Sequence, residues 1–185
     1  MKDVLLNINE KIGSQNLFNK RLDLCEKIER EGKFFPAYYK GNGEYERIDL
    51  DKSGSLSYWR INGEINYSGQ ESTSNVGTEY RKDIPLKFIG YLKKEITSDQ
   101  YFSQDVADSI ISIVTSSNLE VKKILKVRRV SIVATKTIVD PITVEKGEYE
   151  VKTDSIRYTD AYFSIDFTLS IFTNNQCYKS ICNDC

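Results

Sequence analysis

The four cysteines are the residues with the most specific potential chemistry in this chain. Cys177, Cys182 and Cys185 lie within the last nine residues with the spacing C-x4-C-x2-C, and Cys25 lies far upstream. The spacing matches the first three ligands of a plant-type iron–sulfur motif, but no fourth cysteine follows. Cys25 could complete a tetrathiolate zinc site if the C-terminal segment folded back against it. We expect neither a metal nor a cofactor, and a small metal- or redox-linked protein is the alternative.

A calcium loop is the second candidate site. Asp49, Asp51 and Ser53 place oxygen atoms at the first, third and fifth positions of such a loop, and Gly54 takes the sixth. Arg60 occupies the twelfth position, where a calcium loop needs a bidentate glutamate. The segment is therefore expected to be a polar turn.

Composition argues against the commonest enzyme classes. The chain contains no histidine, which excludes Ser-His and Cys-His nucleophile pairs and histidine metal sites. It contains neither a GxxxxGK[ST] phosphate loop nor a GxGxxG motif. Its 26 basic and 27 acidic side chains leave a formal net charge of −1, without the basic footprint of a nucleic-acid-binding domain. The protein is expected not to be an enzyme.

Two groups of side chains could form binding surfaces. Tyrosine and tryptophan are enriched at protein interfaces, and the first group is rich in both: Tyr38, Tyr39, Tyr45, Tyr58, Trp59, Arg60 and Tyr67. The second group is the one basic cluster: Lys122, Lys123, Lys126, Arg128 and Arg129. The aromatic group could equally cover a sheet edge. The basic cluster could face nucleic acid or an acidic partner, or could be a solvated helix end and strand edge.

Hydrophobic periodicity predicts two helices. The 185 residues suffice for one core, so a single domain over residues 1–185 is expected. Apolar side chains recur at helical spacing over residues 3–12 and 15–31, which predicts an opening helix interrupted at Gly13. The same spacing predicts a second helix over residues 98–116.

The remaining periodic segments predict strands. Tyr162–Phe172 alternates strictly, with Phe163, Ile165 and the other apolar residues on one face. Other strands are expected at residues 34–40, 45–49, 56–61, 79–95 and 127–139. A tight turn is expected at Gly41–Gly43, a hairpin turn at Asn62–Gly63, and a further hairpin over residues 142–158 around Lys146–Gly147.

These elements predict an α+β domain in which an antiparallel β-sheet carries two helices on one side. The polar segment 41–78 is expected to extend from this domain as a long β-hairpin or loop arm that orders against a partner. Residues 173–185 are expected to be a flexible tail that contains the cysteines. No segment approaches the roughly 20 apolar residues of a membrane span, so we expect a protein made in a cytoplasm, without a membrane partner.

The opening of the chain resembles a known protein family. A helix that leads into Phe35-Pro36-Ala37-Tyr38-Tyr39 is similar to the start of tail terminator proteins of long-tailed bacteriophages. These proteins continue with a strand, a helix and a long alternating strand, which correspond here to Asp83–Lys93, Ser103–Thr115 and Ala161–Phe172. The long segment 41–78 and the cysteines depart from the family's pattern. Such elaborated versions resemble the neck and tail ring proteins of phages, including crAss-like phages.

The resemblance implies a structural virion protein that forms a homo-oligomeric ring, a hexamer or dodecamer, in the phage neck or tail. Portal, adaptor or tail ring proteins would be its neighbours, and DNA would pass through the lumen with transient, non-specific contact. The aromatic group would then form subunit or partner contacts, and the basic cluster would face the lumen or a partner. Terminator, adaptor and tail-completion roles stay open, and a monomeric protein-binding module is a further alternative.

Overall fold

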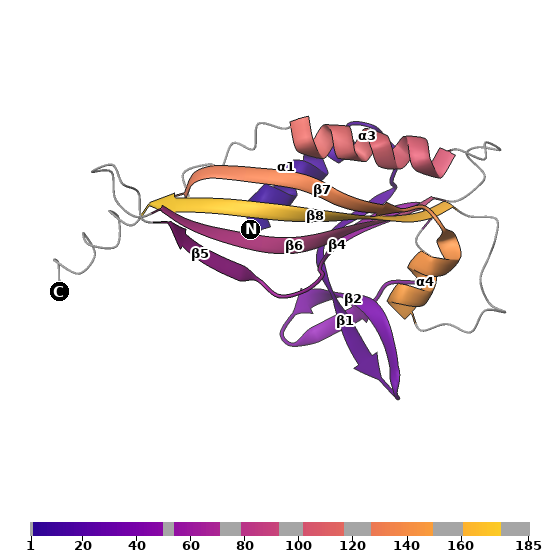
Figure 1. The fold of residues 1–185 in the computed structure, drawn as a ribbon. Helices are drawn as coiled ribbons and strands as arrows, with labels where there is room; N and C mark the ends of the chain where they lie inside the picture. Colours follow the sequence, from indigo (N-terminus) through magenta and orange to yellow (C-terminus); the bar gives the residue numbers. More distant parts are fainter. Residues whose placement is uncertain are drawn as a thin grey trace.

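One eight-stranded mixed β-sheet organises the protein. The computed structural model (Figure 1) describes residues 2–49, 54–70, 79–92, 102–116, 127–149 and 161–174. Within these ranges lie helices α1 (Lys2–Gly13), α3 (Phe102–Ser116) and α4 (Pro141–Tyr149). The strands are β1 (Lys20–Arg30), β2 (Lys33–Gly41), β3 (Glu44–Arg47), β4 (Leu56–Ile61), β5 (Asn66–Gln70), β6 (Glu79–Leu92), β7 (Val127–Ile138) and β8 (Ala161–Asn174). This arrangement confirms the predicted α+β class.

An antiparallel sheet was expected, but the observed sheet is mixed. Its strand order is β3-β2-β1-β4-β6-β8-β7, with β5 paired to β6. Strands β1 and β4 are parallel, while all the other neighbouring strands are antiparallel. The parallel pair arises because the chain leaves β1 through the β2–β3 meander and returns on the opposite side of β1.

The helix predicted over residues 15–31 is wrong, because residues 20–30 form strand β1. The register of β1 on β4 shifts between Arg21 and Leu24. Leu24 and Cys25 pack in different cores because adjacent strand residues point to opposite faces. The irregularity accounts for Leu22, which packs in the same core as Cys25 and not in that of Leu24. When apolar residues lie on both faces of a twisted strand, their spacing along the sequence can match that of a helix. This explains the wrong prediction.

The end of that predicted helix is a hairpin turn instead. Glu31 and Gly32 have φ angles of 54° and 72°. Two successive residues with positive φ form the tight turn that suits the twist of a two-stranded hairpin. The chain therefore reverses directly from β1 into β2, and Ile28 pairs with Phe35 across the hairpin.

The first core lies between the sheet and helices α1 and α3, which cover one face as expected (Figure 1). Strands β6 and β8 form its base in one unbroken register from Glu79↔Asn174 to Leu92↔Ala161. The predicted apolar face of β8 is confirmed, since Phe163, Ile165 and Phe167 are buried in this core. Val106, Ile110 and Val114 of α3 pack above them.

A third helix covers part of the other face, where the sequence predicted a hairpin. Residues 141–149 form α4, and residues 150–158 of the expected hairpin lie outside the described residues. Pro141 suits the first position of a helix, and the backbone N–H groups of Ile142 and Thr143 donate to the Asp140 carboxylate at 3.3 and 3.1 Å. Val144 and Tyr149 of α4 pack in a second core that also contains tyrosines of β4, β6 and β8.

The described parts of segment 41–78 do not form a projecting arm. Strand β4 lies inside the sheet between β1 and β6, and Leu56, Tyr58 and Trp59 are fully buried. Asn62–Gly63 is not a hairpin turn either, because β4 and β5 both run antiparallel to β6, one after the other along the same side. Residues 71–78 and 175–185 lie outside the described residues, and the expected tail begins as the end of β8.

Substitution of Gly90 by alanine tests the packing of the first core. A Cβ atom at Gly90 would lie 2.4 Å from Cζ of Phe163, so we expect Gly90→Ala to lower the free energy of unfolding by about 1–3 kcal/mol. Gly147 in α4 has no heavy atom near such a Cβ, and Gly147→Ala should raise stability by up to about 1 kcal/mol. Urea denaturation measures both, and equal effects of the two substitutions would contradict this packing.

Candidate interface surfaces and a buried ionic cluster

The aromatic group predicted as an interface divides between the core and the surface. Tyr58 and Trp59 are buried, so the interface role expected for them is wrong. The Trp59 indole lies in the first core and donates to Oδ1 of Asn9 at 2.9 Å. Nδ2 of Asn9 in turn donates to Oδ1 of Asp23 at 3.0 Å. Trp59 therefore attaches α1 to the sheet.

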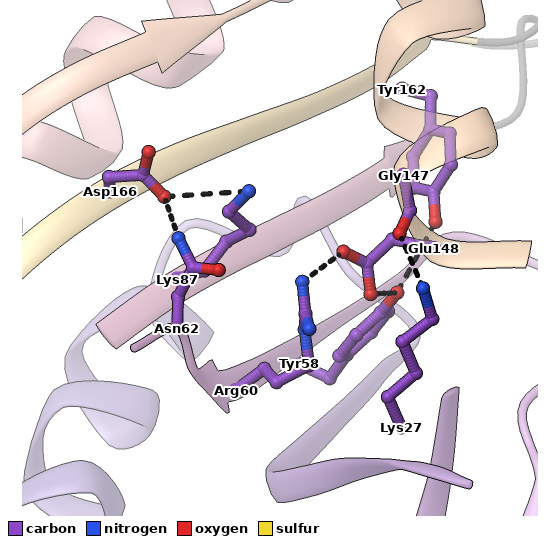
Figure 2. Close-up of polar contacts among 9 residues, drawn as sticks. All are labelled: Lys27, Tyr58, Arg60, Asn62, Lys87, Gly147, Glu148, Tyr162 and Asp166. Carbon is purple, nitrogen blue, oxygen red and sulfur yellow. Dashed lines mark hydrogen bonds and ion pairs between the residues drawn. The ribbon is translucent and has the colours of Figure 1, made fainter. Parts of the chain in front are cut away.

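Arg60 also has an internal role. Nη2 of Arg60 lies 2.7 Å from Oε1 of Glu148 on α4, and the Glu148 side chain is only 2% exposed (Figure 2). The Tyr58 hydroxyl donates to Oε2 of Glu148 at 3.3 Å and lies 3.3 Å from the Tyr162 hydroxyl. We call Tyr58, Arg60, Glu148 and Tyr162 the ionic cluster. Tyr58, Glu148 and Tyr162 are buried, while the Arg60 side chain is 16% exposed.

Burial within the ionic cluster keeps Tyr58 protonated. Burial raises the pKa of Tyr58 well above its usual range, and the neighbouring Tyr162 and the negative charge of Glu148 add to this effect. A neutral Tyr58 hydroxyl can donate a hydrogen bond to the Glu148 carboxylate. The cluster thus joins β4 and β8 to α4 with one buried ion pair and its hydrogen bonds.

Two further contacts hold α4 against the sheet. Nζ of Lys27 on β1 donates to the carbonyl oxygen of Gly147 at 3.2 Å (Figure 2). A cation near a helix C-terminus is favourable because the carbonyl groups there carry partial negative charge. The Tyr149 hydroxyl donates to the carbonyl oxygen of Ile48 at 3.0 Å. No sequence pattern singled out Glu148 or Lys27, because their partners are distant in the chain.

A second polar group lies on the same sheet face beside α4. Asp166 of β8 accepts from Nδ2 of Asn62 at 3.2 Å and lies 3.6 Å from Nζ of Lys87 (Figure 2). Farther along β6, the Ser170 hydroxyl and Nε of Arg81 donate to Asp83 at 2.5 and 2.7 Å. Burial opposes ionisation of Asp83, but these two hydrogen bonds outweigh it and lower its pKa.

The surface members of the aromatic group lie on different strands. Tyr39 of β2 is 54% exposed and its ring centroid is 5.2 Å from that of Tyr45 on β3. Tyr38 is partly buried next to them and contacts the Lys20 ammonium through its ring. Tyr67 lies on β5 and is 74% exposed. The β2–β3 hairpin therefore brings Tyr39 and Tyr45 together, while Tyr38 pairs with Glu46 on the opposite face of the hairpin. Tyr67 belongs to another surface.

Of the basic cluster, the structure describes only the last two residues. Lys122, Lys123 and Lys126 lie outside the described residues, and Arg128 and Arg129 fall at the start of β7. Arg129 is exposed, with its guanidinium 4.1 Å from the ring centroid of Phe172. Arg81 lies 5.8 Å from the same ring on the β6 side. The two arginines shield a phenyl ring on the open face of the sheet.

The two strands at the ends of the sheet, β3 and β7, differ in length and in their surroundings. Strand β3 borders an open groove of about 650 Å³, lined by Ile28, Arg30, Lys40 and residues 43–47. Lys40 and Glu46 form an exposed ion pair beside it. Strand β7 is longer, and Val133 near its middle is 56% exposed. Both strands end the sheet path.

The alternative of a metal or redox site gains no support from Cys25. Burial raises the pKa of the Cys25 thiol to about 12, and the nearby Asp23 charge contributes in the same direction. A thiol must lose its proton to bind a metal or to react as a nucleophile. Within the described ranges no three His, Cys, Asp or Glu side chains gather as metal ligands, and Cys177, Cys182, Cys185 and residues 50–53 of the calcium-like loop lie outside them.

Comparison with known proteins gives no assignment. The sequence matches no protein-family model, and no curated protein is significantly similar to it. None of the helices in the described ranges is long and apolar enough to span a membrane.

The buried ion pair is open to a direct test. Glu148→Gln leaves the Arg60 guanidinium without its counter-charge, so we expect the free energy of unfolding to fall by about 3 kcal/mol. Lys40→Met breaks the exposed Lys40–Glu46 pair and should leave stability nearly unchanged. Guanidinium denaturation of both variants measures the difference, and a Glu148→Gln protein as stable as wild type would show that the pair does not hold α4.

Acid should weaken the start of α4. The Thr143 hydroxyl and the backbone N–H groups of Thr143 and Ile142 lower the pKa of Asp140 from 3.8. The contribution of Asp140 is therefore complete above that pH and declines as the pH falls through the lower folded pKa. At neutral pH, Asp140→Ala should lower the free energy of unfolding by about 1 kcal/mol.

The difference between wild type and Asp140→Ala should shrink as the pH falls below 3.8. Thermal melting across this range measures it. Asp140→Asn, which keeps an oxygen acceptor, is the control and should lose less at neutral pH. A constant wild-type-to-alanine difference down to strong acid would contradict the capping role.

Proposed function

We propose that the protein is a structural virion component that forms a ring in a phage neck or tail, of the tail terminator or head–tail connector type. The observation that carries this proposal is the sheet's two open ends, β3 and β7, on a domain whose helices cover its faces. A sheet that ends in different strands offers two different surfaces, and contacts between different surfaces generate rings.

The order of elements supports the same proposal. A first helix leads into β-strands with Phe35-Pro36-Ala37 in β2, and the central β6, helix α3 and the long alternating β8 follow. Strand β1 takes the place of the helix expected directly before this motif, and the rest of this order is the one on which the resemblance to tail terminators rests. In such a ring the portal, adaptor or tail ring proteins are the neighbours, and DNA passes through the lumen with non-specific contact.

The surface residues fit assembly better than chemistry. The β2–β3 hairpin presents Tyr39, and tyrosine contributes large contact area at interfaces for a small loss of conformational freedom. The buried charges of the ionic cluster are engaged in holding α4. The protein would therefore act by contact with copies of itself and with neighbouring rings, without catalysis.

Oligomeric mass tests the proposal. We expect purified protein to form closed particles of six or twelve copies of the 21.3 kDa chain, measured by sedimentation velocity over a range of concentrations. Negative-stain microscopy should show rings with a central opening. A strictly monomeric protein at the highest soluble concentration would contradict the proposal and favour a monomeric binding module.

A further inference from the structure

The two end strands of the sheet each have a single neighbouring strand within the described part of the chain. Strand β7 pairs only with β8, and β3 pairs only with β2. An open edge presents a row of N–H and C=O groups that can pair with a further strand. The sheet path therefore ends in one edge strand at each end, although Nη2 of Arg30 already donates to the carbonyl oxygen of Tyr45 on β3 at 3.4 Å. Strand β5, which lies off this path, likewise pairs only with β6.

The middle of β7 lacks the features that usually protect an edge. The run from Val130 to Ala134 contains neither charge nor proline and is rich in β-branched residues. Register shifts interrupt the strand only at its two ends, between Val127 and Arg129 and between Ala134 and Lys136. Because a regular, uncharged, exposed edge is prone to pair with other chains, this run is suited to a partner strand.

Charge selects the partner. The ends of β7 carry Arg128, Arg129 and Lys136, and two β7 strands paired antiparallel around the Val130–Ala134 run would bring these like charges together. Strand β3 carries Glu44 and Glu46 together with Arg47, and Arg30 and Lys40 line the groove beside it, so only the two carboxylates present the opposite charge. Glu44 is exposed and makes no ion pair with a described residue.

The other charges of β3 are already engaged. Glu46 pairs with Lys40, and the Arg47 guanidinium lies over the rings of Phe35 and Tyr149, at 5.1 and 6.0 Å. The open groove beside β3 is lined by residues of β1, β2 and β3. Glu44 is therefore the β3 charge that is free to meet a second copy.

We propose that the β7 edge of one copy pairs with the β3 edge of the next copy, so that the sheets continue from subunit to subunit. This inference rests on the proposed ring function and names the contact that closes the ring. The contact is head-to-tail, since it joins two different surfaces. It places Lys136 of one copy near Glu44 of its neighbour.

Charge reversal tests this pairing with a built-in rescue. The variants are Glu44→Lys, Lys136→Glu, both changes in one chain, and a 1:1 mixture of the two single variants. Glu10→Lys on α1 is the matched control, because Glu10 is exposed and lies on neither edge. Sedimentation velocity gives the dissociation constant of assembly, and thermal melting shows that each variant folds.

Each single reversal should raise the dissociation constant about tenfold, because it places like charges across the contact. The double variant and the 1:1 mixture should return it towards the wild-type value, since both restore opposite charges at every contact. Glu10→Lys should assemble as wild type does.

The outcomes separate this inference from the proposed function. Rings that form equally well in every variant would overturn the β7–β3 pairing and leave the ring intact. Stronger assembly of Lys136→Glu without an effect of Glu44→Lys would show pairing of β7 with β7, which also overturns it. Single reversals that weaken assembly without rescue by the mixture would do the same. A wild-type chain that never assembles would overturn both proposals.

Discussion

The antiparallel pairing of β6 with β8 is the interaction on which the rest of the structure depends. These two strands of 14 residues pair along their whole length, and their alternating side chains supply the base of both cores. On one face, Phe88 and Phe163 support α1 and α3. On the other, Tyr91 and Tyr162 support α4. Since β4 and β7 pair with the outer sides of this pair, the rest of the sheet is built outward from it.

Sequence reasoning succeeded where one face of an element is buried and the other is polar. Helix α3 and strand β8 show this pattern clearly, and both were predicted at nearly their observed positions. It failed for β1, whose apolar residues serve two different cores, and for α4, whose nine residues are too short to show a helical period. In both places tertiary packing, not local pattern, decides the conformation.

The functional surfaces were predictable only in part. Tyrosines of the β2–β3 hairpin lie at the surface, but Tyr58 and Trp59 lie on β4, two strands farther into the sheet than β2, and are buried. Composition shows which side chains suit an interface, and only strand order shows which of them reach it. The Arg60–Glu148 pair joins residues 88 positions apart, a separation that no local pattern reveals. Glu44 of β3 and Lys136 of β7 are likewise far apart in the sequence, and no local pattern relates them.

The position of β8 affects how the molecule can be made. This strand comes after β6 and β7 in the chain yet lies between them. A nascent chain on the ribosome therefore exposes one side of β6 and both sides of β7 until residues 161–174 have emerged. Contacts so distant in sequence form slowly, and unpaired strand edges during synthesis promote aggregation. We expect the growing chain to depend on chaperones until its C-terminal strand arrives.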